Sequence, residues 1–211
     1  MSNQQNRASK RPNTQLMVKI AMLSAISFIL TIEGIFRFRL PFFPAFLAMD
    51  IADVPALIGA IAIGPVAGIW ILALRNVISV LITGTASLGI GPLANFIFGV
   101  AYILPLWYIY NRFGRNTRAF VAGAAVGTVV STIMAALLNY YMIIPAFALA
   151  MGMERIIQSG ADANEGINSV GTMVLYAIIP FNLIKNVLVS VVGFVLYKAF
   201  GNVIAAIFKR V

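Results

Sequence analysis

The amino-acid sequence predicts an all-α integral membrane protein, a six-transmembrane-helix bundle with both termini in the cytoplasm. Of its 211 residues, 61% are hydrophobic and only 10% are charged, and the mean hydropathy is +0.96. Several apolar runs are long enough to cross a hydrocarbon core of about 30 Å, which takes roughly 20 helical residues. We expect a single membrane domain over residues 1–211, in which about 16–198 form the bundle and 1–15 and 199–211 are cytoplasmic tails.

Six apolar segments are the predicted spans, and glycine and proline mark several of their ends. Gly64-Pro65 separates the second span from the third, and Pro92 suits the first turn of the fourth. The polar segment 151–168 separates the fifth span from the sixth. We place the spans at about residues 16–36, 51–64, 65–83, 92–111, 118–150 and 170–198.

The basic residues divide unequally between the two sides of the membrane. Lysine and arginine near the ends of spans favour the cytoplasmic side. With the N-terminus inside, ten of the 15 basic residues fall in inner segments: Arg7, Lys10, Arg11, Lys19, Arg112, Arg115, Arg118, Lys198, Lys209 and Arg210. The outer segments hold three, with all six acidic residues: Arg37, Arg39, Arg155, Glu33, Asp50, Asp53, Glu154, Asp162 and Glu165. This asymmetry predicts that both termini are inside, and it explains the net charge of +9 without a nucleic-acid partner.

The residue types that the chain lacks exclude several functions. The sequence has no cysteine and no histidine, so we expect neither a metal site nor the usual nucleophiles and general bases of enzymes. It also has no GxxxxGK[ST] loop, so the chain does not hydrolyse ATP by itself. We find no arrangement of a nucleophile with a base, and therefore expect no catalytic residue.

Two basic residues, Arg75 and Lys185, remain at membrane depth. A charge at the bilayer centre costs about 2.5–3.5 kcal/mol, so each must face the bundle interior, a cavity or a partner. For Arg75 we favour an ion pair with Asp50 or Asp53 at the outer start of the second span; contact with a ligand is the alternative. Asp53 is also a candidate cap for that helix.

Lys185 belongs to a group of polar residues that we expect to converge in the outer half of the bilayer. Asn182 lies three residues before Lys185 and shares its helix face. Asn139 on the fifth span and Asn95 near the outer end of the fourth lie at comparable depth. Amides with one cation suit an outward-open pocket for a neutral, partly aromatic solute, which would partner the ammonium group in place of the protein's own carbonyls. The alternative is that these residues only join helices to one another.

The segment 37–50, "RFRLPFFPAFLAMD", is too aromatic and too rich in proline for a plain connection. An aromatic loop over an outward pocket can act as a lid that excludes water and stacks on a flat ligand. An interfacial aromatic belt is the alternative interpretation.

Small residues on the first span provide a further surface. Ala21 and Ala25 lie four residues apart, and such spacing allows close approach of another helix. The spacing does not distinguish a helix of this chain from one of another subunit, and packing within the chain is the default interpretation.

Four segments together resemble a known family: "MDIADVPALIGAIAIGPVAGI", "GPLANFIFG", "LLNYYMIIPAF" and "IPFNLIKNV". The chain is similar to the riboflavin-specific substrate-binding (S) components of energy-coupling factor (ECF) vitamin transporters, over roughly residues 16–198. The combination of segments is specific, whereas each one alone is weak. The loop that follows the fifth span is longer than the family leads us to expect.

This resemblance implies a function and a set of site residues. Such proteins bind one vitamin near the outer face and deliver it inward with a membrane coupling protein (EcfT-type) and two ATP-binding-cassette ATPases, in the bacterial cell membrane. Riboflavin is then the transported ligand, and no cofactor is implied. The resemblance places ligand contacts at Asn139, Asn182 and Lys185, with the 37–50 loop over the flavin ring. Further implied contacts are Asn95, Asp50, Phe46, Met49 and Tyr140, and Ala21 and Ala25 match the docking surface for the coupling protein.

Two other functions are alternatives on the sequence. One is an S component for another water-soluble vitamin. The other is an ion-coupled secondary transporter, which is disfavoured because we expect no Asp or Glu at the membrane centre to relay protons, and no inverted repeat is evident.

Overall fold

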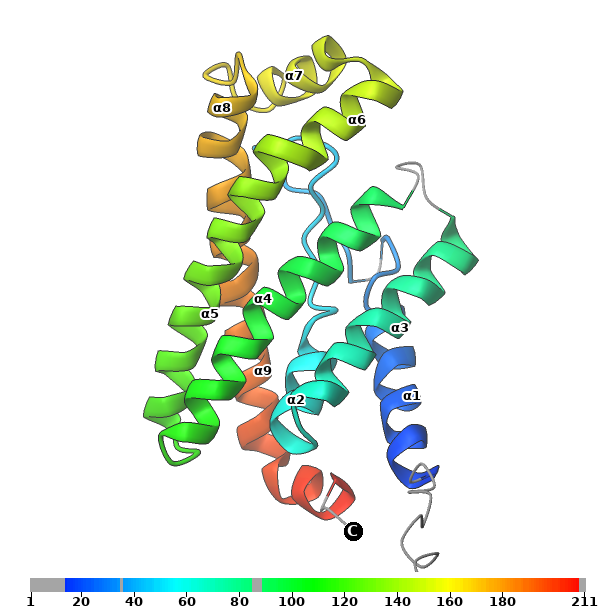
Figure 1. The fold of residues 1–211 in the computed structure, drawn as a ribbon, viewed down its shortest axis with the longest axis vertical. Coiled ribbons are helices and arrows are strands. Elements are labelled where there is room, and N and C mark those ends of the chain that lie inside the picture. Colours follow the sequence, from blue (N-terminus) through cyan, green and yellow to red (C-terminus); the bar gives the residue numbers. More distant parts are fainter. Residues whose placement is uncertain (1–13, 35, 85–88, 209–211) are drawn as a thin grey trace, which may run out of the picture.

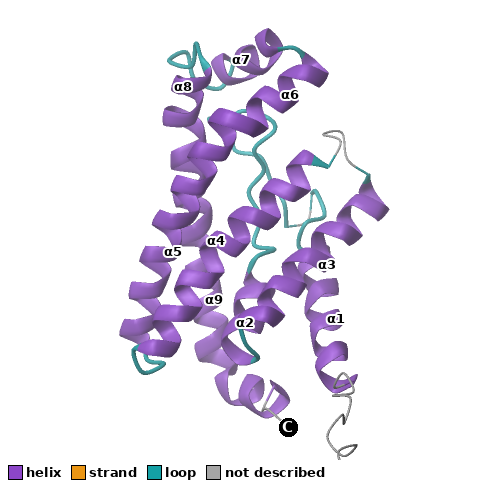
Figure 2. Ribbon diagram, in the orientation of Figure 1, coloured by secondary structure: helices purple, strands orange, loops and turns teal. Residues whose placement is uncertain are grey.

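The computed structural model describes residues 14–34, 36–84 and 89–208, and in these ranges its regular structure is helical apart from isolated β-bridges (Figure 2). Two π-helical turns interrupt the longest helices: η1 (Asn139–Ile143) and η2 (Val174–Ile178). The α-helices are α1 (Thr14–Ile29), α2 (Val54–Ala62), α3 (Pro65–Thr83), α4 (Ile90–Arg112), α5 (Thr117–Leu138), α6 (Ile144–Met151), α7 (Met153–Ala161), α8 (Val170–Met173) and α9 (Ile179–Phe208).

The helices form an elongated bundle in which the start of α1 and the end of α9 lie at the same end (Figure 1). The short helices α6, α7 and α8 lie at the opposite end. Within the described residues, four helical stretches are long and apolar enough to cross a membrane: Pro65–Ile82, Ile90–Arg112, Thr117–Leu149 and Val170–Ala199. The prediction of an all-α, multi-pass membrane protein is confirmed.

The first helix is shorter than the sequence suggested, because α1 ends at Ile29 and not near residue 36. Its last turn tightens: the Thr31 hydroxyl and the Thr31 backbone N–H both donate to the Phe28 carbonyl, at 2.6 and 2.8 Å. Gly34 then has a positive φ of 84°, which a helix does not accommodate. Glu33 therefore lies in the connection and not on the helix.

The second predicted span contains a helix that is long enough to cross only about half of the membrane core. α2 has nine residues and is thus about 14 Å long, too short to cross a hydrocarbon core of about 30 Å. In Figure 1 the connection from α1 rises beside the upper helices and then descends to meet α2 in the lower half of the view. Gly64-Pro65 separates α2 from α3, as the sequence predicted, with Pro65 in the first turn of α3. Asp53 precedes α2 but makes no side-chain capping hydrogen bond.

The polar segment 151–168 contains a helix that the sequence analysis missed. α7 covers nine of these residues, and the buried Ile156 and Gly160 lie on its inner face. Gly160 packs so closely that a Cβ there would lie 2.7 Å from Ile167 and 2.8 Å from Met173. The apolar spacing of residues 153, 156, 157 and 160 is helical and was the available signal.

The structure describes only part of the two predicted cytoplasmic tails. α9 continues to Phe208, ten residues beyond the predicted end of the last span, so most of the segment 199–211 is helical. Residues 1–13 and 209–211, with Arg7, Lys10, Arg11, Lys209 and Arg210, lie outside the described residues.

Proline shapes the two helices that carry the polar residues. Pro145 and Pro180 each follow a pair of isoleucines, and each lies just after a π-helical turn. A proline has no N–H and leaves one carbonyl of the preceding turn without its partner. The helix widens there instead: the N–H of Ile144 donates to Asn139, and that of Ile179 donates to Val174, five residues back. Such turns are frequent at functional sites.

Two hydrophobic clusters form the core, and the polar residues lie at the boundary between them. The first cluster contains residues from α1 to α5 and from α9, among them Leu57, Leu72 and Tyr102. The second contains Met49 from the loop before α2, Ile144, Ile156 and Met173. Along the chain, Asp50 and Asp53 lie between Met49, which belongs to the second cluster, and Val54, which belongs to the first.

Helices α4 and α5 pack closely against each other. A Cβ at Gly127 on α5 would lie 2.4 Å from the carbonyl oxygen of Tyr102 on α4, so only glycine fits. The Ser131 hydroxyl also donates to the Phe98 carbonyl at 3.0 Å, again joining α5 to α4. The small residues of the fifth span thus pack inside the chain.

Candidate functional site

Four buried charged residues, from α3, α9 and the connection before α2, form a continuous chain of ion pairs. Nη1 of Arg75 on α3 lies 2.6 Å from Oδ1 of Asp53, as the sequence predicted. Nζ of Lys185 on α9 lies 3.7 Å from Oδ2 of Asp53 and 3.4 Å from Oδ1 of Asp50. All four residues are less than a tenth exposed. Two acids and two bases cancel, which is how a helix bundle can hold four formal charges.

This arrangement changes two expectations. Lys185 was expected to find its partner in a bound solute, but two carboxylates of the chain already face its ammonium group. Asp50 and Asp53 were expected at the outer start of a span, whereas the connection before α2 carries them inward to where both are only 6% exposed. Acidic groups therefore do lie inside the bundle, each within 4 Å of a base.

Three buried asparagines line a pocket together with Lys185. Nδ2 of Asn139 donates to the Ala135 carbonyl, and Nδ2 of Asn182 donates to the Ile178 carbonyl, both at 2.8 Å. Each amide is thereby anchored to its own helix next to a π-helical turn. The Nδ2 of Asn186 is buried and has no hydrogen-bond partner among the described residues. An unpartnered buried donor costs about 1–3 kcal/mol, so a bound guest that accepts from it would be stabilised.

These polar residues line a cavity made of two adjoining chambers. The first chamber, of about 130 Å³, contains Asp50, Asp53, Asn139, Asn182, Lys185 and Asn186 in its wall. The second chamber, of about 330 Å³, is lined in part by Glu33, Asp50 and Arg75. Both are lined by Arg37, Phe46, Asp50, Gly91, Asn95 and Phe147. Sites for small organic ligands usually measure about 300–1,000 Å³, so the two chambers together have the size that such a ligand requires.

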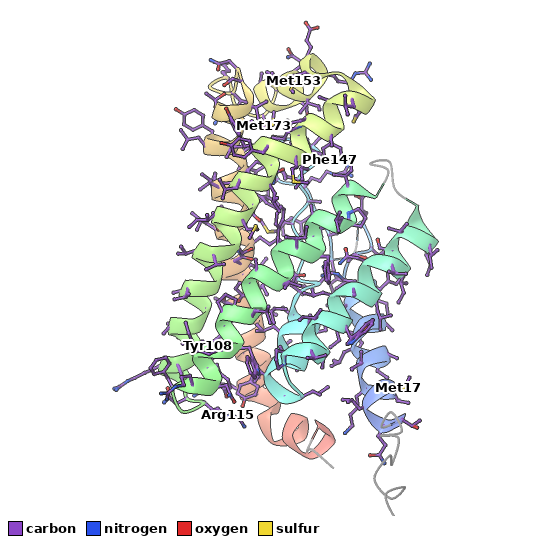
Figure 3. The ribbon with its side chains drawn as sticks, viewed as in Figure 1. Met17, Tyr108, Arg115, Phe147, Met153 and Met173 are labelled. Atoms are coloured by element: carbon purple, nitrogen blue, oxygen red, sulfur yellow. The ribbon has the colours of Figure 1, made fainter. Side chains whose placement is uncertain are left out.

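Aromatic side chains form the apolar part of the wall. Phe46, Phe98, Phe147 and Phe181 line the first chamber. Phe147, on α6, lies in the upper half of Figure 3, at the end of the bundle opposite Arg115. Phenylalanine rings beside amides and an ammonium group suit a flat, conjugated guest with polar edges.

The 37–50 loop covers this cavity and is fixed to the bundle. A β-bridge closes it, with backbone hydrogen bonds of 3.0 and 2.8 Å between Phe38 and Met49. Its Phe43 is buried and packs edge-on against Phe181, with ring centroids 5.4 Å apart. Its Phe46 lines both chambers. The loop therefore contributes directly to the cavity wall.

The structure brings most of the predicted contact residues together. Asn139, Asn182, Lys185, Asn95, Asp50 and Phe46 all line the first chamber. Met49 lines neither chamber; this loop residue is 1% exposed, and its side chain packs in the second hydrophobic cluster. Tyr140 also lines neither chamber: it follows Asn139 on the helix, faces another direction, is 45% exposed and packs on Tyr141.

Ala21 and Ala25 lie on the exposed face of α1, away from its buried residues Leu23, Ser24 and Ser27. They are therefore not packed within the described part of this chain, contrary to the default interpretation of their spacing.

Sequence reasoning missed several polar residues of the cavity, among them Arg37 and Asn186. Arg37 was assigned only to an outer segment, yet it lines both chambers, and its buried Nε has no hydrogen-bond partner in the part of the chain that the structure describes. Asn186 directly follows Lys185 and lies four residues after Asn182, so the helical spacing from Asn182 could have identified it.

Comparisons with known proteins agree on one family. The model of the "ECF transporter, substrate-specific component" family matches residues 15–197. A riboflavin transporter RibU of Staphylococcus aureus is 32% identical over 188 residues, covering 88% of this chain and 90% of the relative. A riboflavin transporter FmnP of Bacillus subtilis is 33% identical over 177 residues, covering 83% of this chain and 86% of the relative.

A solved structure has the same fold. It is described as the S component of a bacterial ECF transporter, is 33% identical and superposes with a TM-score of 0.73 over 90% of this chain and 98% of the other. With the family match over residues 15–197, this places the chain among the substrate-specific components of ECF transporters, which are transport proteins and not enzymes.

Proposed function

We propose that this chain captures riboflavin from outside a bacterial cell and delivers it across the plasma membrane together with ATPase partners. One observation carries the ligand assignment: the wall of the first chamber joins an ammonium group and four amides to four phenylalanines. Relatives that are named riboflavin transporters support the same ligand. Riboflavin is uncharged, flat and conjugated, with polar edges and a polyol tail, and it matches this wall.

We assign the contacts from the geometry of the cavity. Asn139, Asn182 and Lys185 hydrogen-bond the polar edge of the ring or the ribityl hydroxyls, and Phe46 covers the ring. Asn95 and Asp50 lie at the junction of the two chambers, within reach of the tail. Met49 acts indirectly, by holding the loop in place. We assign Tyr140 no contact with the ligand.

The topology that we propose has six passes and both termini in the cytoplasm. The descending loop together with α2 makes the second pass, and residues 1–211 form one membrane domain. Two observations support this orientation: the first and last described helical ends lie together (Figure 1), and the basic residues Arg112, Arg115 and Arg118 belong to that same end.

Energy for uptake comes from other chains in this proposal. We infer that a membrane coupling protein docks on the exposed face of α1 at Ala21 and Ala25 and connects the chain to two ATP-binding-cassette ATPases. Family membership supports such an assembly, and the exposure of both alanines supports the site.

A binding measurement on the purified chain tests the ligand. We expect the protein to copurify with a yellow flavin whose fluorescence is quenched, and to bind added riboflavin stoichiometrically after the flavin is removed. Thiamine and biotin serve as competitors and should not displace it. A well-folded preparation that fails to quench riboflavin, or that binds one of the competitors instead, would overturn the assignment.

A further inference from the structure

Both chambers of the cavity have balanced formal charges. The charged residues described in the wall of the first are Arg37, Lys185, Asp50 and Asp53. Those in the wall of the second are Arg37, Arg75, Glu33 and Asp50. Each chamber therefore has two bases and two acids, although the chain as a whole has a net charge of +9.

Asp53 is the central member of the buried chain of ion pairs. One carboxylate oxygen lies 2.6 Å from Arg75, and the other lies 3.7 Å from Lys185. Arg75 lines the second chamber and not the first, whereas Asp53 lines the first, so their ion pair connects the walls of the two chambers. The side chains of Arg75 and Asp53 are only 3% and 8% exposed, so water screens their charges weakly.

The long distances between the Lys185 ammonium group and the two carboxylates affect how a ligand can bind. Charge-assisted hydrogen bonds between an ammonium group and a carboxylate usually measure about 2.7–2.9 Å, and neither of its two contacts is that short. The two carboxylates balance the charge of Lys185 without tightly occupying its N–H donors. The ammonium group can thus donate to a neutral acceptor, while the cavity offers no excess positive charge to an anion.

We propose that the Arg75–Asp53 pair determines specificity by keeping the site electroneutral, so that it takes an uncharged flavin in preference to the phosphate ester of that flavin. This inference rests on the proposed function. A phosphate monoester carries a charge of about −1.5 to −2 at neutral pH. In a poorly screened cavity with no net positive charge, that anion loses its hydration and gains no compensating attraction.

Changing one member of the pair should shift the preference in a direction set by charge alone. Asp53→Asn keeps the shape and leaves one extra positive charge, so binding of the phosphate ester should improve relative to riboflavin. Arg75→Gln leaves one extra negative charge and should worsen that relative binding. The double variant restores neutrality and should restore the ratio of the two dissociation constants, whatever happens to each affinity.

The experiment measures fluorescence quenching by the purified full-length chain with riboflavin and with flavin mononucleotide. We expect the ratio of dissociation constants to move at least about tenfold, in opposite directions for the two single variants, because a unit charge within about 10 Å of the phosphate at an effective dielectric constant of about 20 has at least that effect. Arg118→Gln, an exposed residue at the opposite end of the bundle, removes the same charge as Arg75→Gln and should leave the ratio unchanged.

If a variant of the pair does not fold, Asp50→Asn and Arg37→Gln repeat the comparison, because both residues line both chambers. Asp50→Asn adds one positive charge to the wall, as Asp53→Asn does, and Arg37→Gln removes one, as Arg75→Gln does. Ratios that stay constant, or that move the same way in both single variants, would overturn the inference and leave the proposed function intact. A parent protein that binds flavin mononucleotide as tightly as riboflavin would also overturn it. Failure of the parent to bind riboflavin at all would instead refute the proposed function.

Discussion

The Nζ atom of Lys185 on α9 lies 3.4 Å from Oδ1 of Asp50, at the end of the loop that covers the cavity. One buried ion pair thus joins the last long helix to the segment over the site. The backbone N–H of Ala52 also donates to Asp50 Oδ1, at 3.2 Å, and fixes this carboxylate at the turn into α2. A guest that engages Lys185 is therefore connected through Asp50 to the loop that covers it.

We expect Lys185→Met to weaken riboflavin binding about 10-fold to 100-fold, because a hydrogen bond to a charged group contributes roughly 1.5–3 kcal/mol. Fluorescence titration of the purified variant measures this. Lys198→Met, on the same helix but outside both chambers, is the matched control and should bind like the parent. If the two variants bind equally well, Lys185 does not contact the ligand.

Two ion pairs of equal length, one buried and one exposed, allow a test of how burial changes the contribution of an ion pair to stability. Arg75–Asp53 and Arg39–Glu33 both measure 2.6 Å, but the Arg75 side chain is 3% exposed and that of Arg39 is 57% exposed. Arg75→Met leaves Asp53 without its closest partner and should lower the free energy of unfolding by about 3–5 kcal/mol. Arg39→Met should lower it by less than about 1 kcal/mol.

Thermal unfolding of the detergent-solubilised proteins compares these variants. The double variant Arg75→Met with Asp53→Asn should recover part of the loss, because it leaves no uncompensated carboxylate. Equal melting temperatures for Arg75→Met and Arg39→Met would show that the buried pair does not stabilise the fold.

Neighbouring phenylalanines in the covering loop provide the next test. Phe43 is 6% exposed and packs on Phe181, whereas Phe42 is 55% exposed. We expect Phe43→Ala to loosen the loop and to accelerate riboflavin dissociation, as measured by stopped-flow recovery of flavin fluorescence. Phe42→Ala removes the same ring and should change the dissociation rate little. Similar acceleration by both variants would argue against a specific anchor at Phe43.

The sequence predicted the ion pair of Arg75 because a lone charge in hydrocarbon is so costly that it requires a partner. The same reasoning brought Asn139, Asn182 and Lys185 into one cavity, since their helical spacing and depth coincide. Periodicity alone does not give the path of the 37–50 loop, which has no repeating pattern. The depth of Asp50 and Asp53 depends on that path and was therefore misjudged.

The π-helical turns show a different limit of sequence reasoning. The repeated isoleucine-isoleucine-proline segments that end at Pro145 and Pro180 are visible in the sequence, and proline predicts a disturbed helix. Whether the helix kinks, breaks or widens depends on which neighbours accept the freed carbonyl groups. Here both helices widen, and Asn139 and Asn182 lie beside the widened turns.

The exposed alanines of α1 allow the docking proposal to be separated from ligand binding. Ala21 and Ala25 line no part of the cavity, so Ala25→Trp should leave riboflavin affinity unchanged. The bulky ring should prevent close approach of a partner helix and abolish copurification with the coupling protein and its ATPases. Val129→Trp, on an exposed position of α5 across the bundle from α1 (Figure 1), adds the same ring and should assemble normally. Normal assembly of Ala25→Trp would place the docking surface elsewhere, and loss of riboflavin binding in that variant would mean that α1 contributes to the site itself.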